Sequence, residues 1–200
     1  MTQNNKVILI SLNELNFEKI EKYLTGNKLK TLSKIKNNLS TTISETEYNK
    51  LEPWIQWTSF YYGLNADNHK IKNLGQIYKG DKENIFEELE NKGLNVGAIS
   101  PMNLQNKLKN PSFFIPDPWV ETNSDNNYWS RLIHKSISSL VKNNVRKKNK
   151  FYDYLILLMV FLKFAKIKNY FYYILFFIKG LKKKLFHALF LDLLLHDIHI

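Results

Sequence analysis

Two short apolar runs constrain the fold of this chain more than any other feature of its sequence. Residues 7–12 read VILISL and residues 94–99 read LNVGAI, and both runs are rich in branched aliphatic side chains. Short, nearly uninterrupted apolar runs of this kind are typical of strands that are buried on both faces of a parallel sheet. We therefore predict that both runs are parallel strands of one sheet.

Helical patterns fill the sequence between and around these runs. Apolar residues recur at helical spacing in residues 17–24, 53–62 and 82–92, and a glycine closes each pattern. Residues 112–115 form a short extended piece within an aromatic, proline-rich loop. This order of elements predicts an α/β domain over residues 1–130, in which helices flank a parallel sheet.

Residues 131–200 differ from this domain in charge. The first 130 residues hold 15 Lys and 15 acidic residues, whereas the last 70 hold 14 Lys plus Arg and 3 Asp, so the net charge of +11 (14 − 3) lies in the last third. A charge asymmetry of this kind suggests an anionic partner, which is either nucleic acid or an acidic membrane surface. We predict a separate, basic α-helical region.

The apolar stretches of this basic region are short. Residues 155–162 and 170–178 are separated by Lys163, Lys166 and Lys168, whereas a transmembrane helix needs about 20 nearly uninterrupted apolar residues. We expect long helices that pack together or lie on an anionic membrane surface. Nucleic acid is the less favoured partner, because long aliphatic stretches between the basic residues need burial or lipid.

Four residues are candidates for chemistry. Asn13 and Glu14 follow the first predicted strand, and ligands of open α/β sheets bind beyond the carboxyl ends of the strands. A carboxylate at such a position can hold a hard cation. Glu52 lies at a predicted helix N-terminus, where the free N–H groups favour anions. Thr58 carries a hydroxyl group on the same predicted helix. The structural alternatives are surface acids for Glu14 and Glu52 and a core position for Thr58.

Several segments resemble the alkaline phosphatase superfamily, which includes nucleotide pyrophosphatases, phosphodiesterases and sulfatases. The first apolar run with Asn13 and Glu14, and GLNADNHKI at residues 63–71, carry the general likeness. The segments LEPWIQW at 51–57, SPMN at 100–103 and FIPDPW at 114–119 resemble more closely a bacterial branch that is associated with surface-polysaccharide genes.

This resemblance implies an incomplete alkaline-phosphatase-like fold and a metal-dependent hydrolase of phosphate or sulfate esters. A divalent metal (Zn, Mn or Ca) would be held at Asn13 and Glu14, and the substrate would be a phosphorylated or sulfated glycan or lipid intermediate. The chain departs from the family in having Asn13 at the position of a metal-binding Asp and Pro53 at the position of the nucleophile. Glu52 and Thr58 are the nearest replacements for the nucleophile.

The remaining metal ligands of the family lie in a C-terminal half that does not follow here, so we expect a fragment that is inactive alone. The alternative is a non-catalytic protein of the same fold that binds anionic glycolipid or a membrane surface. The chain contains no cysteine, which fits a reducing compartment. We therefore expect a cytoplasmic protein, peripheral on the inner face of the membrane.

Overall fold

The computed structural model describes residues 6–13, 17–24, 32–34, 40, 45–146, 151–183 and 185–199. The chain divides into two compact units, residues 1–53 and residues 54–200, and each is considered by itself. In the part of the first unit that the structure describes lie the helix α1 (Phe17–Leu24), helical residues 32–34 and the 3-10 turn η1 (Tyr48–Lys50). Helix α1 confirms the prediction for residues 17–24.

The first apolar run does not form the predicted strand. Residues 7–12 have no regular secondary structure, and their side chains are exposed, with Val7 at 89% and Ile10 at 73%. A strand requires a neighbour that pairs with its backbone N–H and C=O groups. Within the described residues the only sheet contains two other strands, so the prediction of a buried strand at residues 7–12 is wrong.

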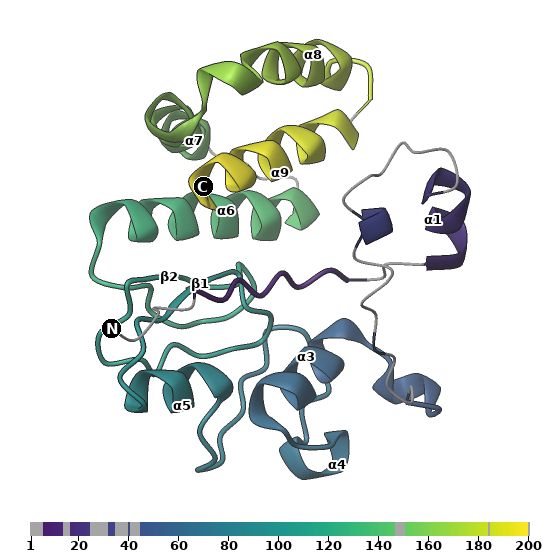
Figure 1. Ribbon diagram of the computed structural model, residues 1–200. Helices are drawn as coiled ribbons and strands as arrows, with labels where there is room; N and C mark the ends of the chain where they lie inside the picture. The colour runs from purple at the N-terminus through teal and green to yellow at the C-terminus, as the bar shows by residue number, and fades with distance from the viewer. Residues whose placement is uncertain are drawn as a thin grey trace. The chain divides into compact units, whose positions relative to one another are not determined.

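The second apolar run and the extended piece at 112–115 do pair. Strands β1 (Gly97–Ile99) and β2 (Phe113–Ile115) are parallel, with Gly97 opposite Phe113 and Ile99 opposite Ile115. The predicted class, a mixture of helices with a parallel sheet, is therefore confirmed. The described sheet is small, and helices dominate the second unit (Figure 1).

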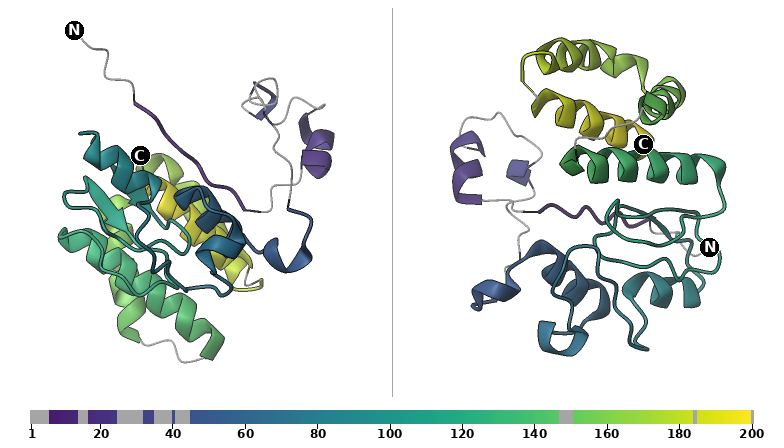
Figure 2. Two further views of the ribbon diagram at one scale, coloured as in Figure 1. Left: turned by 90° about the horizontal axis from the view of Figure 1, so that it is seen from below. Right: turned by 180° about the vertical axis from the view of Figure 1, so that it is seen from behind.

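Neighbouring residues of β2 point into two different cores, because side chains alternate across a strand. Phe114 packs with Tyr61, Tyr62 and Leu104, on the side of α3 (Pro53–Tyr62), α4 (Ala66–His69) and α5 (Ile85–Asn91). Ile115 packs into a second core together with α6 (Tyr128–Arg146). The sheet therefore lies between two helical layers (Figure 2).

Capping side chains set where two of these helices begin. Helix α3 spans the residues predicted for it. Helix α5 begins at Ile85, later than predicted, because the Asn84 side chain accepts the N–H groups of Phe86 and Glu87. Helix α6 begins at Tyr128, before the predicted start, and the Asn127 side chain accepts the N–H of Trp129 at its first turn.

The basic region is helical, as predicted. Helix α6 is followed by α7 (Phe151–Phe164), the 3-10 turn η2 (Ile167–Asn169), α8 (Tyr170–Gly180) and α9 (Leu185–His199). Their shared core contains Ile133, Ile156, Val160, Tyr173 and Leu194, each at most 2% exposed. Helix α9 contacts both α7 and α8, and α6 contacts α7.

Candidate functional site

The residues predicted for metal binding and catalysis are placed in different parts of the chain. Thr58 is fully buried in α3, and its hydroxyl donates to the carbonyl of Trp54 at 2.8 Å. Asn13 and Glu52 are exposed and belong to the first unit, whereas Thr58 belongs to the second. Glu14 lies outside the described residues, so a site that joins these four side chains stays a prediction.

The described residues contain no obvious metal centre outside these positions either. Within that part of the chain, no group of three or more His, Asp or Glu side chains is arranged to hold an ion. Helix α3 and the end of α4 do carry a serine–histidine pair, Ser59 and His69.

Ser59 on α3 and His69 at the end of α4 lie in contact, with 2.9 Å between Ser59 Oγ and His69 Nε2. The other ring nitrogen, Nδ1, accepts the backbone N–H of Ile71 at 3.0 Å. Burial lowers the pKa of His69, so the ring is neutral near pH 7. A neutral ring carries one proton, and since Nδ1 is the acceptor, that proton must be on Nε2.

This tautomer determines what the pair can do. Nε2–H donates to Ser59 Oγ, whereas a general base must accept the proton of its nucleophile. His69 therefore cannot activate Ser59 in this arrangement. The pair instead joins α3 to the end of α4, and His69 is 4% exposed. We assign a structural role to this contact.

A second polar cluster lies just beyond the carboxyl ends of both strands. Asn103 follows β1 and donates its backbone N–H to Asp117 Oδ2, two residues after β2, at 3.2 Å. The Asn103 side chain accepts the N–H of Gly75 at 2.7 Å and donates to the carbonyl of Asn73 at 2.9 Å. Asn103 adopts a left-handed backbone conformation, with φ of 55°, which asparagine tolerates better than most residues.

The donors and acceptors of this cluster are directed at one another. Burial raises the pKa of Asp117, and its two oxygens accept the N–H groups of Asn103 and Trp119. Both side-chain groups of Asn103 are also occupied. The cluster therefore fixes the loops at the end of the sheet, at the place where open α/β sheets bind ligands.

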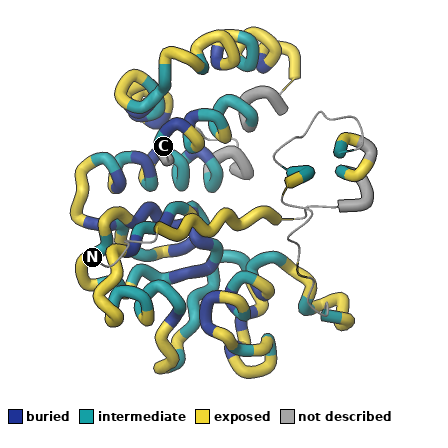
Figure 3. Tube along the Cα trace, viewed as in Figure 1, coloured by how far each residue is buried: buried dark blue, intermediate teal, exposed yellow. Residues whose placement is uncertain are grey.

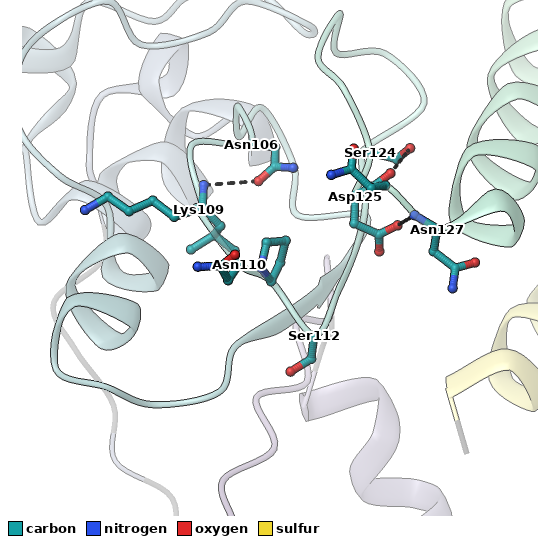
Figure 4. Close-up of a pocket in the computed structure, with 10 residues that line it drawn as sticks. Asn106, Lys109, Asn110, Ser112, Ser124, Asp125 and Asn127 are labelled. Atoms are coloured by element: carbon teal, nitrogen blue, oxygen red, sulfur yellow. Dashed lines mark hydrogen bonds between the residues drawn. The ribbon is translucent and has the colours of Figure 1, made fainter.

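A polar cleft of about 360 Å³ opens between two loops of the second unit (Figure 4). Its lining includes Asn106, Asn110, Ser112 and Asn127. Asp125 also lines it, but its carboxylate is already held by the N–H groups of Phe114 and Asn127 and by the hydroxyl of Ser130. The Lys109 side chain extends away from Asp125 in this view. The cleft offers mainly amide and hydroxyl groups.

The most distinctive surface of the second unit is formed by the outer sides of α7 and α8. Figure 3 shows exposed residues along both helices. We call it the α7–α8 surface, and define it by nine apolar side chains that are 42–84% exposed: Phe151, Leu155, Leu158, Leu162, Ile167, Phe171, Ile174, Ile178 and Leu181. Steps of four and three residues place such positions on one face of a helix.

The opposite sides of α7 and α8 are buried and fixed. Asp153 accepts the hydroxyl of Ser139 at 2.6 Å, which ties α7 to α6. Asp197 on α9 accepts the N–H of Lys166 at 2.7 Å and the hydroxyl of Tyr173 at 2.9 Å, which ties the start of α8 to α9. The α7–α8 surface is therefore preformed by packing.

Lysines accompany these apolar residues. Exposed Lys163 and Lys168 lie near the start of α8, and exposed Lys179, Lys182 and Lys183 lie at its end. The only acid in residues 151–183 is Asp153, which is 4% exposed. The α7–α8 surface is therefore both apolar and basic. None of the helices that the structure describes has the length and the apolar character of a transmembrane segment.

Comparisons with known proteins assign no family. No protein-family model matches the chain, and neither do curated proteins or solved structures. The resemblance noted in the sequence therefore stays a hypothesis.

Sequence reasoning named the segments of the Asn103–Asp117 cluster but did not predict their contact. Both segments follow extended residues, which was the available signal, because parallel strands end at the same edge of a sheet. The Ser59–His69 contact had no comparable signal in the sequence.

Proposed function

We propose that this protein binds anionic membrane surfaces through the α7–α8 surface, as a peripheral protein on the inner face of the membrane. The supporting observation is that nine apolar side chains face solvent beside five exposed lysines. Soluble monomers rarely expose this many large apolar side chains on two consecutive helices without a partner. Lysines favour an anionic partner, because their charge is attracted to acidic lipid headgroups.

The geometry fits binding along the membrane better than crossing it. The 14 residues of α7 and the 11 residues of α8 correspond to about 21 Å and about 16 Å of helix, against a hydrocarbon core of about 30 Å. Short apolar helices flanked by lysines can lie in the interface, where exposed apolar side chains enter the acyl boundary and lysines reach the headgroups.

Vesicle flotation tests this proposal. The purified chain should float with vesicles that contain anionic lipid at low salt, bind neutral vesicles weakly, and dissociate as salt rises, because salt screens the lysine charges. Absence of binding to anionic vesicles at low salt would contradict the proposal. Self-association without vesicle binding would instead identify a second copy of the chain as the occupant of the surface.

Matched variants locate the contact. Replacing Phe171, Ile174 and Ile178 with Ser removes three exposed apolar side chains from the surface. Their insertion contributes about 3 kcal/mol, so the variant should bind about a hundredfold more weakly. The control replaces Ile8, Ile10 and Leu94 with Ser, which are also exposed but lie outside the surface, and it should bind like the original chain.

A second candidate is the metal-dependent ester hydrolase implied by the resemblance to alkaline phosphatases. One observation favours it: two of the segments that carry the resemblance meet beyond a parallel sheet, through the contact of Asn103 with Asp117. Metal-dependent hydrolysis of an aryl phosphodiester by this chain, lost in Glu14→Ala, would support this function and would overturn the expectation that the chain is inactive alone. Hydrolysis that Glu14→Ala leaves unchanged would contradict the proposed metal site.

A further inference from the structure

We infer that the α7–α8 surface recognises the charge density of an anionic bilayer rather than one particular headgroup. This inference rests on the proposed membrane binding and names the partner more closely. A headgroup-specific site requires several fixed donors that converge on one phosphate or carboxylate, as in the forked hydrogen bonds of arginine. The lysines near α7 and α8 do not converge on one point in this way.

The cations lie in two separate groups. Lys163 and Lys168 precede α8, whereas Lys179, Lys182 and Lys183 lie at its end. Lys168 and Lys182 lie at opposite ends of α8, whose 11 residues correspond to about 16 Å of helix. Hydrogen bonds to one headgroup require donors within about 3 Å of the same oxygens. The two groups therefore contact different lipids.

The cations themselves are lysines, which recognise a particular headgroup less specifically than arginines do. Residues 151–200 contain no arginine, and lysine presents a single charge at the end of a flexible stem. Lys168, Lys182 and Lys183 are exposed, and no side-chain hydrogen bond or ion pair fixes them to any residue that the structure describes. They are free to follow lipids that diffuse beneath the surface.

Within residues 151–183 no exposed acid opposes this attraction. Asp153 is buried and its carboxylate accepts the hydroxyl of Ser139. Each lysine near the membrane then adds its own attraction, which decays over a Debye length. Additive attraction of this kind predicts a steep dependence of binding on the fraction of anionic lipid, whatever the chemistry of that lipid.

The test compares headgroups at equal charge. Vesicles of phosphatidylcholine are prepared with about 30 mol % of either phosphatidylglycerol or phosphatidylserine, which gives both a similar negative surface potential. The expected result is binding that agrees within about twofold between the two headgroups and rises steeply with their mole fraction. A preference of about tenfold for one headgroup at equal charge would overturn the inference and leave the proposed function standing. Absence of binding to both would overturn the proposed function itself.

Charge variants complete the experiment. Replacing Lys168, Lys182 and Lys183 with Gln should weaken binding to both kinds of vesicle by the same factor, about a hundredfold at low salt. The control, in which the exposed Lys72, Lys79 and Lys92 become Gln, removes the same charge elsewhere and should bind normally. Weakening toward only one headgroup would overturn the inference. Equal weakening by the control would also overturn it, because binding would then depend on net charge and not on the α7–α8 surface.

Discussion

Asp125, in the loop before α6, and Phe114 of β2 exchange two hydrogen bonds. The N–H of Phe114 donates to Asp125 Oδ2 at 2.5 Å, and the N–H of Asp125 donates to the carbonyl of Phe114 at 3.0 Å. The same carboxylate accepts the hydroxyl of Ser130 in the first turn of α6. One buried acid therefore pairs with the backbone of the strand and fixes the helix that covers it.

Replacing Asp125 with Ala should destabilise the second unit. The substitution leaves the buried N–H of Phe114 without its acceptor and removes a charged partner from two further donors. We expect the free energy of unfolding to fall by about 3 kcal/mol, measured by urea unfolding. The control, Asp81→Ala at an exposed position, should change it by less than about 0.5 kcal/mol. Equal stabilities for the two variants would contradict this role of Asp125.

The two sides of the α7–α8 pair should respond differently to truncation. Ile156 is 2% exposed and lies in the shared core, whereas Ile174 is 60% exposed. We expect Ile156→Ala to lower the free energy of unfolding by about 3 kcal/mol, because it leaves a cavity. Ile174→Ala should lower it by less than about 0.5 kcal/mol. Thermal or urea unfolding measures both, and a large effect at Ile174 would place that side chain in a core.

The helices of this fold could be predicted because their signals are local. Pro53 and Gly63 bracket α3, and α1 follows an apolar period, so both helices match the predicted ranges. The run at residues 7–12 failed as a strand because pairing depends on a neighbour that local sequence does not specify. The pairing of β1 with β2 was implied only by their extended residues.

The sites were harder to predict, since they depend on contacts between distant residues. The apolar and basic character of α7 and α8 was visible in the sequence, but which side faces solvent depends on packing against α9. The sequence allowed Thr58 to be either a catalytic candidate or a core residue. In the structure its hydroxyl donates to the carbonyl of Trp54. Asn103 and Asp117 meet only because two loops end at one edge of the sheet.

The Ser59–His69 pair should be chemically inert. With the proton of His69 on Nε2, Ser59 has no base, so a fluorophosphonate probe should not label it. Nitrogen NMR should find the Nε2–H tautomer and a pKa below 6.5, since burial lowers the pKa of His69. Labelling that disappears in Ser59→Ala would contradict this assignment.

The same histidine gives a pH dependence with a definite sign. A lowered pKa in the folded state means that the unfolded state binds the proton more readily. The contribution of His69 to stability is therefore present above pH 6.5 and is lost as pH falls through the folded pKa. Ser59→Ala should retain this loss, because the loss comes from burial of the ring. It is measured as a decrease in the free energy of unfolding as the pH is lowered from 7 through the pKa of His69 in the folded state.

Asp197 should give a second pH dependence, in a more acidic window. Burial alone would raise its pKa, but hydrogen bonds from the Lys166 N–H, the Tyr173 hydroxyl and the Asn169 amide outweigh burial and leave the pKa below its ordinary value of 3.8. Since the folded pKa is depressed, this contribution is present above pH 3.8 and is lost as pH falls through the folded pKa.

Asp197→Asn tests this arrangement. An amide cannot accept from all three donors, so the variant should be about 3 kcal/mol less stable than the original chain at pH 7. The difference should shrink as pH falls below 3.8, because the original carboxylate then becomes protonated as well. Asp192→Asn, on the same helix, is the control: burial raises the pKa of Asp192, so losing its charge should not lower stability at pH 7. Urea unfolding at a series of pH values measures both variants, and a constant difference between Asp197→Asn and the original chain across that series would show that the charge of Asp197 does not hold α8 to α9.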